Sequence, residues 1–196
     1  MRKFLVIGLC LLVLSGCDKK PDVLKPYVDP LVEFMPVADI SGYKNMPNTS
    51  NLVKKGSLEI INQLYKEKRD FVFYIGHDYC AWCMDLFPVL MDVINEYDLT
   101  VIYVNDAEEF DKGIFESNIF SSFIDNFYDY LEYDENYEKE LYVPFVVFVR
   151  EGKVIFSNIG TVDNHDAYEQ PLSKAQTKKL TNRLSNACIK FLENRE

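Results

Sequence analysis

Three features are scarce in this sequence, and each scarcity excludes a class of protein. Basic residues are few: 21 lysines and arginines stand against 31 acidic residues, and the formal net charge is −10. This balance argues against nucleic acid or a polybasic membrane surface as a partner. Cysteines number only five, too few for a scaffold held together by disulfide bonds. No apolar run approaches the roughly 20 residues that a membrane-spanning helix needs, so the chain reads as one acidic globular domain.

The first seventeen residues have the pattern of a targeting signal. Arg2 and Lys3 supply a positive start, and the apolar core Phe4–Leu14 is too short to span a membrane as a mature helix. The segment ends Leu-Ser-Gly-Cys at Cys17, followed by the polar Asp18–Lys20, and this ending resembles the lipobox of bacterial lipoproteins. In that family the cysteine takes a diacylglyceryl group and becomes the first residue of the mature protein. The alternative is an ordinary signal peptide in which Cys17 has no role.

The lipobox resemblance implies three parts: a signal peptide over residues 1–16, a tether over 17–30 and a single domain over 31–196. Three prolines and alternating charges within 17–30 favour an extended tether. We therefore expect an extracytoplasmic protein that is anchored to a bacterial membrane through the lipid on Cys17.

The domain is organised around one stretch in which a buried strand leads into a helix. The apolar run Phe71–Ile75 ends at the breaker Gly76 and predicts a strand buried on both faces. After Cys80-Ala81-Trp82-Cys83, apolar residues continue at helical spacing: Leu86, Phe87, Leu90 and Ile94. Cys80 is expected at the helix N-terminus, where unpaired N–H groups and the helix dipole favour a thiolate, and Cys83 one turn further on, facing the core.

Apolar periodicity predicts further elements on either side of this stretch. They are an edge strand over Leu31–Met35, a helix beginning at Ser57, a strand over Leu99–Val104 in a parallel βαβ unit, an antiparallel hairpin of Pro144–Val149 and Val154–Ile159, and a closing helix over Leu172–Leu192 with Cys188 buried.

Residues 106–140 carry most of the charge imbalance, with twelve acidic residues and two lysines. Apolar residues recur at helical spacing from Phe120 to Leu131, which predicts an amphipathic helix lying on the domain. Tyr133–Glu140 is expected to be a solvated acidic loop, since no spacing in it matches a calcium-binding loop.

Several spacings are similar to those of the thioredoxin fold. Pro88 follows the second cysteine by five residues, where the family kinks its active-site helix. Val143-Pro144 opens the apolar run of the third core strand, as the family's cis-proline does. Gly152 and Gly160 follow at intervals of eight residues, matching glycines of the family hairpin. With one insertion allowed, the resemblance covers residues 56–196, and it is nearest to the small extracytoplasmic thioredoxin-like proteins of bacteria, including the bacteriocin-transport-accessory type.

The resemblance implies an α/β thioredoxin fold: a central mixed sheet flanked by helices, with the acidic helical insertion at 106–140 before the cis-proline strand. It also implies thiol–disulfide exchange on exported proteins, together with a redox partner protein and without a cofactor. In that reaction Cys80 attacks a substrate disulfide as a thiolate, and Cys83 resolves the mixed disulfide. The substrate groove implied by the family consists of His77, an exposed Trp82, Val143 and Pro144.

The sequence departs from the family at two places. Tyr74 stands where the family usually buries an Asp or Glu, six residues before the first cysteine, and a tyrosine with an ordinary pKa of about 10 is a poor proton acceptor. The dipeptide between the cysteines is Ala81-Trp82, which differs from the family's usual pairs. Both departures leave open whether electrons flow to or from the substrate. Without a buried carboxylate, the proton acceptor of the resolving step is expected to be water or another group.

Other functions for the two cysteines stay open at this stage. His77, Cys80 and Cys83 have ligand-like spacing and could hold a metal ion with His165 as a fourth ligand. A static disulfide would instead suit a non-catalytic binding module that serves a secretion or export system. The strand-to-helix setting favours the catalytic dithiol without metal. His77 is then either a turn residue or a positive charge that lowers the pKa of Cys80.

Overall fold

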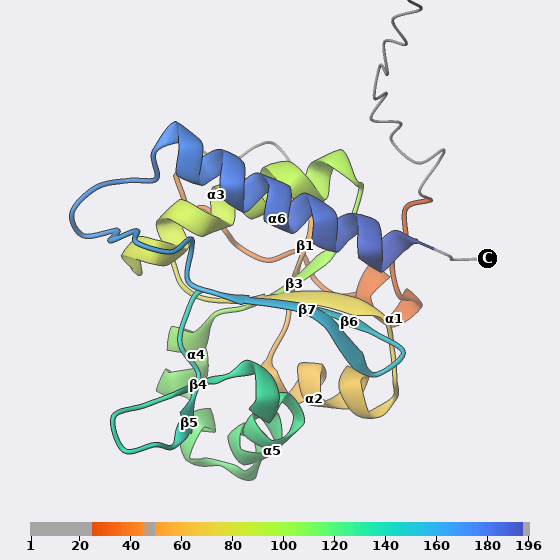
Figure 1. Ribbon diagram of the computed structural model, residues 1–196. Helices are drawn as coiled ribbons and strands as arrows, with labels where there is room; N and C mark the ends of the chain where they lie inside the picture. Colours follow the sequence, from red (N-terminus) through yellow and green to blue (C-terminus); the bar gives the residue numbers. More distant parts are fainter. Residues whose placement is uncertain (1–24, 45, 47–49, 194–196) are drawn as a thin grey trace, which may run out of the picture.

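The computed structural model describes residues 25–44, 46 and 50–193 (Figure 1). The predicted signal peptide, the lipidation site Cys17 and the tether up to residue 24 lie outside the described residues. In the part of the chain that is described, no helix combines the length and the apolar character needed to cross a membrane.

The described chain alternates between helices and strands. In chain order these are α1 (Pro30–Glu33), β1 (Val53–Lys55), α2 (Leu58–Lys66), β2 (Phe71–Ile75), α3 (Ala81–Glu96), β3 (Val101–Val104), α4 (Asp106–Asp111), α5 (Asn118–Phe127), β4 (Glu132–Tyr133), β5 (Lys139–Glu140), β6 (Phe145–Arg150), β7 (Lys153–Ile159) and α6 (Lys174–Leu192). Short 3₁₀ turns cover Ser50–Leu52, Ile114–Glu116 and Tyr128–Tyr130.

Five strands form the central sheet in the order β1-β3-β2-β6-β7. β1, β3 and β2 run parallel, whereas β6 and β7 are antiparallel to their neighbours. In the middle strand, Val72 pairs with Val101 of β3 on one side and with Phe148 of β6 on the other. Helix α3 joins the parallel pair β2 and β3, which is the predicted βαβ unit. This mixed sheet flanked by helices confirms the predicted α/β thioredoxin fold.

Helices cover both faces of the sheet (Figure 1). α3 and α6 lie on one face, and α2 and α5 lie on the other. Strand β2 contributes to both cores because its successive side chains alternate in direction: Val72 and Tyr74 pack under α3, whereas Phe71, Phe73 and Ile75 pack toward α2 and α5. All five side chains are buried, which is why this strand reads as an unbroken apolar run.

Side-chain caps begin helices α2 and α6. Ser57 accepts a hydrogen bond from the backbone N–H of Ile60 at 3.3 Å and so caps α2, as its position predicted. Ser173 caps α6 and forms a capping box with Gln176, so this helix begins at Lys174, slightly later than expected.

The acidic insertion is more ordered than its composition indicates. The amphipathic helix is present as α5 and buries Phe123 and Phe127, but it ends at Phe127 and the chain passes into a 3₁₀ turn. Tyr133–Glu140 is mostly exposed, as predicted, but it is not an irregular loop: β4 and β5 pair as a short antiparallel hairpin. Asp134 closes that hairpin, because its carboxylate accepts the N–H groups of Asn136 and Glu138 at 2.9 and 2.7 Å.

The expected edge strand over Leu31–Met35 is wrong. These residues form the helical turn α1 and its C-cap, because Asp29 accepts the backbone N–H of Leu31 at 2.9 Å and Pro30 occupies the first helical position. The first strand of the sheet is β1, which lies about twenty residues further along the chain. Val37 makes only an isolated antiparallel bridge to Lys54.

Candidate active site

The two cysteines lie where β2 gives way to α3, beside the loop that precedes β6. Cys80 is the N-cap of α3, and its Sγ accepts a hydrogen bond from the backbone N–H of Cys83 at 3.2 Å. Cys80 is half-buried, whereas Cys83 is fully buried. The Val143–Pro144 peptide bond is cis, and the Val143 carbonyl oxygen lies 3.9 Å from the Sγ of Cys80. Segments far apart in sequence therefore meet at Cys80.

The surroundings of the two sulfur atoms drive their pKa values apart. A hydrogen bond with the Cys83 thiol lowers the pKa of Cys80 to about 7, with help from the Cys83 backbone N–H and against the effect of burial. Burial is the main cause that raises the pKa of Cys83, and the hydrogen bond with Cys80 adds to it. Near neutral pH one sulfur is thus partly a thiolate and reachable, and the other is a shielded thiol.

His77 lies in the turn that separates β2 from Cys80. Its Nδ1 is 2.9 Å from the Oδ1 of Asp106, and its ring packs on Tyr79 with centroids 4.0 Å apart. A positive charge on His77 lowers the pKa of Cys80, whereas the Asp106 carboxylate raises it. The sign of the His77 charge effect agrees with the interpretation of His77 as a modulator of Cys80. Sequence reasoning missed Asp106, although it directly follows a strand parallel to β2, and parallel strands end at the same sheet edge.

Trp82 is less accessible than expected. It is half-buried, its Nε1 donates a hydrogen bond to the His165 carbonyl oxygen at 3.3 Å, and its ring meets the edge of Tyr168 at 4.8 Å. The loop after β7 thus folds over the indole and covers part of it. Tyr79, which precedes Cys80, and Tyr168, which contacts Trp82, are 74% and 81% exposed. No pattern in the sequence had singled out Tyr168.

The structure does not bring His165 to the cysteines as a fourth ligand. Its Nδ1 lies 2.6 Å from Thr161 Oγ1, and its Nε2 lies 3.2 Å from an Asp85 carboxylate oxygen and 3.1 Å from the Gln170 carbonyl oxygen. Both ring nitrogens are therefore occupied within the protein. Across residues 25–44, 46 and 50–193, no group of three His, Cys, Asp or Glu side chains is placed to hold a metal ion.

Tyr74, at the position where the resemblance implies a buried carboxylate, lies close to Cys83. It is fully buried, and its hydroxyl oxygen is 3.2 Å from that of Tyr43. Sequence reasoning could not find Tyr43, because it comes from a loop segment whose position depends on packing alone. Cys188, on α6, is buried, and burial raises the pKa of its thiol to about 12, which leaves it unreactive.

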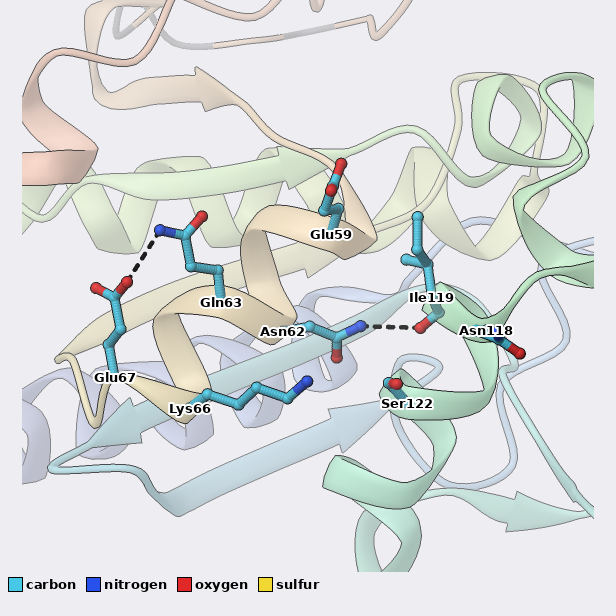
Figure 2. Close-up of a pocket in the computed structure, with 8 residues that line it drawn as sticks. All are labelled: Glu59, Asn62, Gln63, Lys66, Glu67, Asn118, Ile119 and Ser122. Atoms are coloured by element: carbon cyan, nitrogen blue, oxygen red, sulfur yellow. Dashed lines mark hydrogen bonds between the residues drawn. The ribbon is translucent and has the colours of Figure 1, made fainter.

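A pocket of about 530 Å³, lined mostly by polar residues, lies between α2 and α5, on the sheet face away from α3 (Figure 2). Its side chains pair with neighbours: Asn62 donates to the Ile119 carbonyl oxygen at 2.8 Å, and Gln63 donates to Glu67 at 2.9 Å. The pocket is separated from the dithiol by the sheet and forms no part of this site.

No family model matches the chain, and a search of curated proteins found no relative. Among solved structures, the chain is similar to the crystal structure of thioredoxin O2 from Arabidopsis thaliana in the oxidized state, with 19% sequence identity and a TM-score of 0.35. The match covers 66% of this chain and 94% of that one. The assignment of the fold depends on the strand order and the position of α3 and not on this likeness.

Proposed function

We propose that this protein carries out thiol–disulfide exchange on exported proteins through the Cys80-Ala81-Trp82-Cys83 dithiol, outside the cytoplasm and attached to a bacterial membrane. The inequality of the two cysteines supports this proposal best. Cys80 is accessible with a pKa lowered to about 7, and Cys83 is buried with its N–H directed at the Cys80 sulfur. A nucleophile and a resolving thiol need these opposite properties.

The exchange proceeds in two displacements. The Cys80 thiolate attacks one sulfur of a substrate disulfide, which gives a mixed disulfide and releases the other substrate sulfur as a thiolate. Cys83 then attacks the Cys80 sulfur, so a Cys80–Cys83 disulfide forms and the substrate leaves as a dithiol. Run in reverse, the same steps oxidise a substrate dithiol. A redox partner protein is needed to return the pair to its starting state, and no cofactor is needed.

The substrate is proposed to lie between the Val143 side of the dithiol and the exposed aromatic rings. The Val143 carbonyl oxygen lies 3.9 Å from the Cys80 sulfur and provides a backbone group for an extended polypeptide. Tyr79 and Tyr168 expose most of their rings near Cys80 and Trp82, where they can contact side chains that flank the substrate cysteine.

The location outside the cytoplasm is proposed from the sequence alone. The lipobox-like ending at Cys17 supplies the membrane anchor, and the exported proteins in the same compartment supply the disulfides.

The deciding experiment is a redox titration of the purified full chain in glutathione buffers. The fraction of Cys80–Cys83 disulfide is measured by alkylation and peptide mass. We expect reversible titration with a midpoint in the range of known exchange proteins, roughly −120 to −270 mV. Replacing Cys188 with alanine should leave the midpoint unchanged. A bond that resists reduction below about −300 mV would instead identify a structural disulfide and favour a non-catalytic binding module of an export system.

A further inference from the structure

Three buried tyrosines lie in the same hydrophobic core as Cys83. Tyr74 is completely buried, and Tyr43 and Tyr103 are each 5% exposed. The hydroxyl oxygens of Tyr74 and Tyr43 lie 3.2 Å apart. The rings of Tyr74 and Tyr103 stack with centroids 5.8 Å apart, and Tyr43 meets Tyr103 edge-on at 6.2 Å. Close packing of this kind holds each ring in one orientation, so the Tyr74 hydroxyl has a defined position.

Gly76 has no side chain, and the space that a Cβ atom would occupy is taken by the Tyr74 hydroxyl and the Cys83 side chain. A Cβ atom at this position would lie 2.8 Å from the Tyr74 ring carbon that carries the hydroxyl and 2.9 Å from the Sγ of Cys83. The two groups therefore flank the same point, which places the Tyr74 hydroxyl next to the Cys83 side chain. A glycine is required here for close approach of the groups around it.

We propose that Tyr74 is a catalytic residue whose hydroxyl donates a hydrogen bond to the Cys83 sulfur as that sulfur becomes the attacking thiolate. This role rests on the proposed function, because it concerns the step that resolves the mixed disulfide. It differs from the role of a buried carboxylate, which accepts a proton.

The chemistry of a buried phenol supports a donor. Burial raises the pKa of Tyr74 well above its ordinary value, so the hydroxyl keeps its proton throughout the reaction. A group that keeps its proton cannot act as a base, but it can donate to an anion, and hydrogen bonds to charged groups are the strong ones. Burial is the main cause that raises the pKa of Cys83; the backbone of His77 and, after it, the Tyr74 hydroxyl lower this pKa and so oppose the effect of burial.

Tyr43 orients the donor. A phenol has one hydrogen to donate and can also accept, and either hydroxyl can donate across the 3.2 Å contact between Tyr43 and Tyr74. In the proposed arrangement Tyr43 donates to the Tyr74 oxygen, which leaves the Tyr74 hydrogen for Cys83. The Tyr43 pKa is also raised, chiefly by burial, so Tyr43 keeps its own proton. Tyr43 does not touch the reacting sulfur and is a positioning residue.

Atoms and electrons balance without a further reactant. The Cys83 thiol passes its proton to water, its sulfur bonds to the Cys80 sulfur, and the bond between Cys80 and the substrate sulfur breaks. The leaving substrate sulfur takes up a proton through water, so the substrate is reduced and the Cys80–Cys83 pair is oxidised.

The test separates the two displacements in one reaction. The full chain, with Cys10 and Cys17 replaced by serine, is reduced and mixed with 5,5′-dithiobis(2-nitrobenzoate). Attack by Cys80 releases one coloured thiolate, and resolution by Cys83 releases the second. For Tyr74→Phe we expect an unchanged first release and a second release slowed roughly ten- to hundredfold. Raising the pH should restore part of the lost rate, because hydroxide then forms the thiolate that the hydrogen bond no longer favours.

Two further variants complete the test. Tyr65→Phe removes a hydroxyl from the opposite face of the sheet and should change neither release. Tyr43→Phe leaves the Tyr74 hydroxyl in place and should slow the second release less than Tyr74→Phe. Equal second releases in the parent chain, Tyr74→Phe and Tyr43→Phe would overturn the role of Tyr74. The absence of any second release from the parent chain would instead contradict the proposed function itself.

Discussion

The hydrogen bond from the backbone N–H of Cys83 to the sulfur of Cys80, 3.2 Å long, couples the ionisation of one cysteine to the position of the other. It exists because Cys80 occupies the N-cap of α3, where the first N–H groups of the helix have no backbone partner. A thiolate satisfies such a donor better than a thiol does, so the helix start itself favours the reactive form.

Alkylation of Cys80 should follow a titration with a midpoint at about pH 7, because hydrogen bonds with Cys83 lower its pKa to that value. Cys83 should stay unmodified in the folded protein, since it is buried. Cys83→Ala removes the thiol that contributes most to lowering the pKa of Cys80, so the midpoint should rise. The backbone N–H of residue 83 remains and still lowers this pKa in the variant. The rate of iodoacetamide alkylation is measured at a series of pH values, and peptide mass identifies which cysteine is modified in each protein. A midpoint that is the same in both proteins would contradict this assignment.

The same shift makes the stability of the reduced protein depend on pH. The folded-state pKa of Cys80 is below its ordinary value of 9.0, so the thiolate stabilises the folded state. This contribution is complete above pH 9 and is lost as the pH falls through about 7. Denaturant unfolding of the reduced chain and of Cys80→Ser should therefore show a difference in unfolding free energy that grows with pH over this window.

Two charge substitutions should shift Cys80 in opposite directions. His77→Gln removes a positive charge that lowers the pKa of Cys80, so the alkylation midpoint should rise. Asp106→Asn removes a nearby negative charge that raises this pKa, so the midpoint should fall. Shifts of the same sign would show that the substitutions act by disturbing the 2.9 Å contact between the two side chains and not by charge.

Gly76→Ala should destabilise the protein, because its Cβ would collide with Tyr74 and Cys83. Overpacking in a well-packed core typically costs about 1–3 kcal/mol, measured here as a loss of unfolding free energy in denaturant. Combining the change with Tyr74→Phe removes one of the colliding atoms. The double variant should therefore lose less unfolding free energy than the sum of the losses in the two single variants. A loss equal to that sum would show that the new Cβ atom does not collide with the Tyr74 hydroxyl.

Removing the resolving cysteine should trap the substrate. Cys83→Ala produced in its native cell envelope should accumulate mixed disulfides at Cys80, visible as bands that disappear on reduction and identifiable by mass. Cys80→Ala should trap nothing, because Cys83 is shielded. Equal trapping by both variants would contradict the roles assigned to the two cysteines.

Lipid attachment is tested by Cys17→Ser. Metabolic labelling with palmitate should be present in the parent chain and absent in the variant, and the size of the mature protein should change. Labelling that persists would show that the lipobox-like ending has been misread.

Local sequence determined the core of the site. The run Phe71–Ile75, the break at Gly76 and the helical spacing after Cys83 are short-range patterns, and each is realised within a few residues of the position it predicts. The α/β class was predictable for the same reason, since alternating strands and helices with a parallel crossover permit few arrangements. The thioredoxin fold itself was predicted from the resemblance of the motif spacings to those of that family. Where a local cap was overlooked, as at Asp29, the prediction of a strand over Leu31–Met35 was wrong.

Tertiary structure alone decided which distant groups surround the two sulfur atoms. Val143 reaches Cys80 from 63 residues away, and Tyr43 reaches Tyr74 from 31 residues away. The loop that carries His165 covers part of Trp82, which the family resemblance implied to be exposed. These contacts follow from the packing of whole elements against one another, and no periodicity or spacing within a segment records which side chain of another segment it will meet.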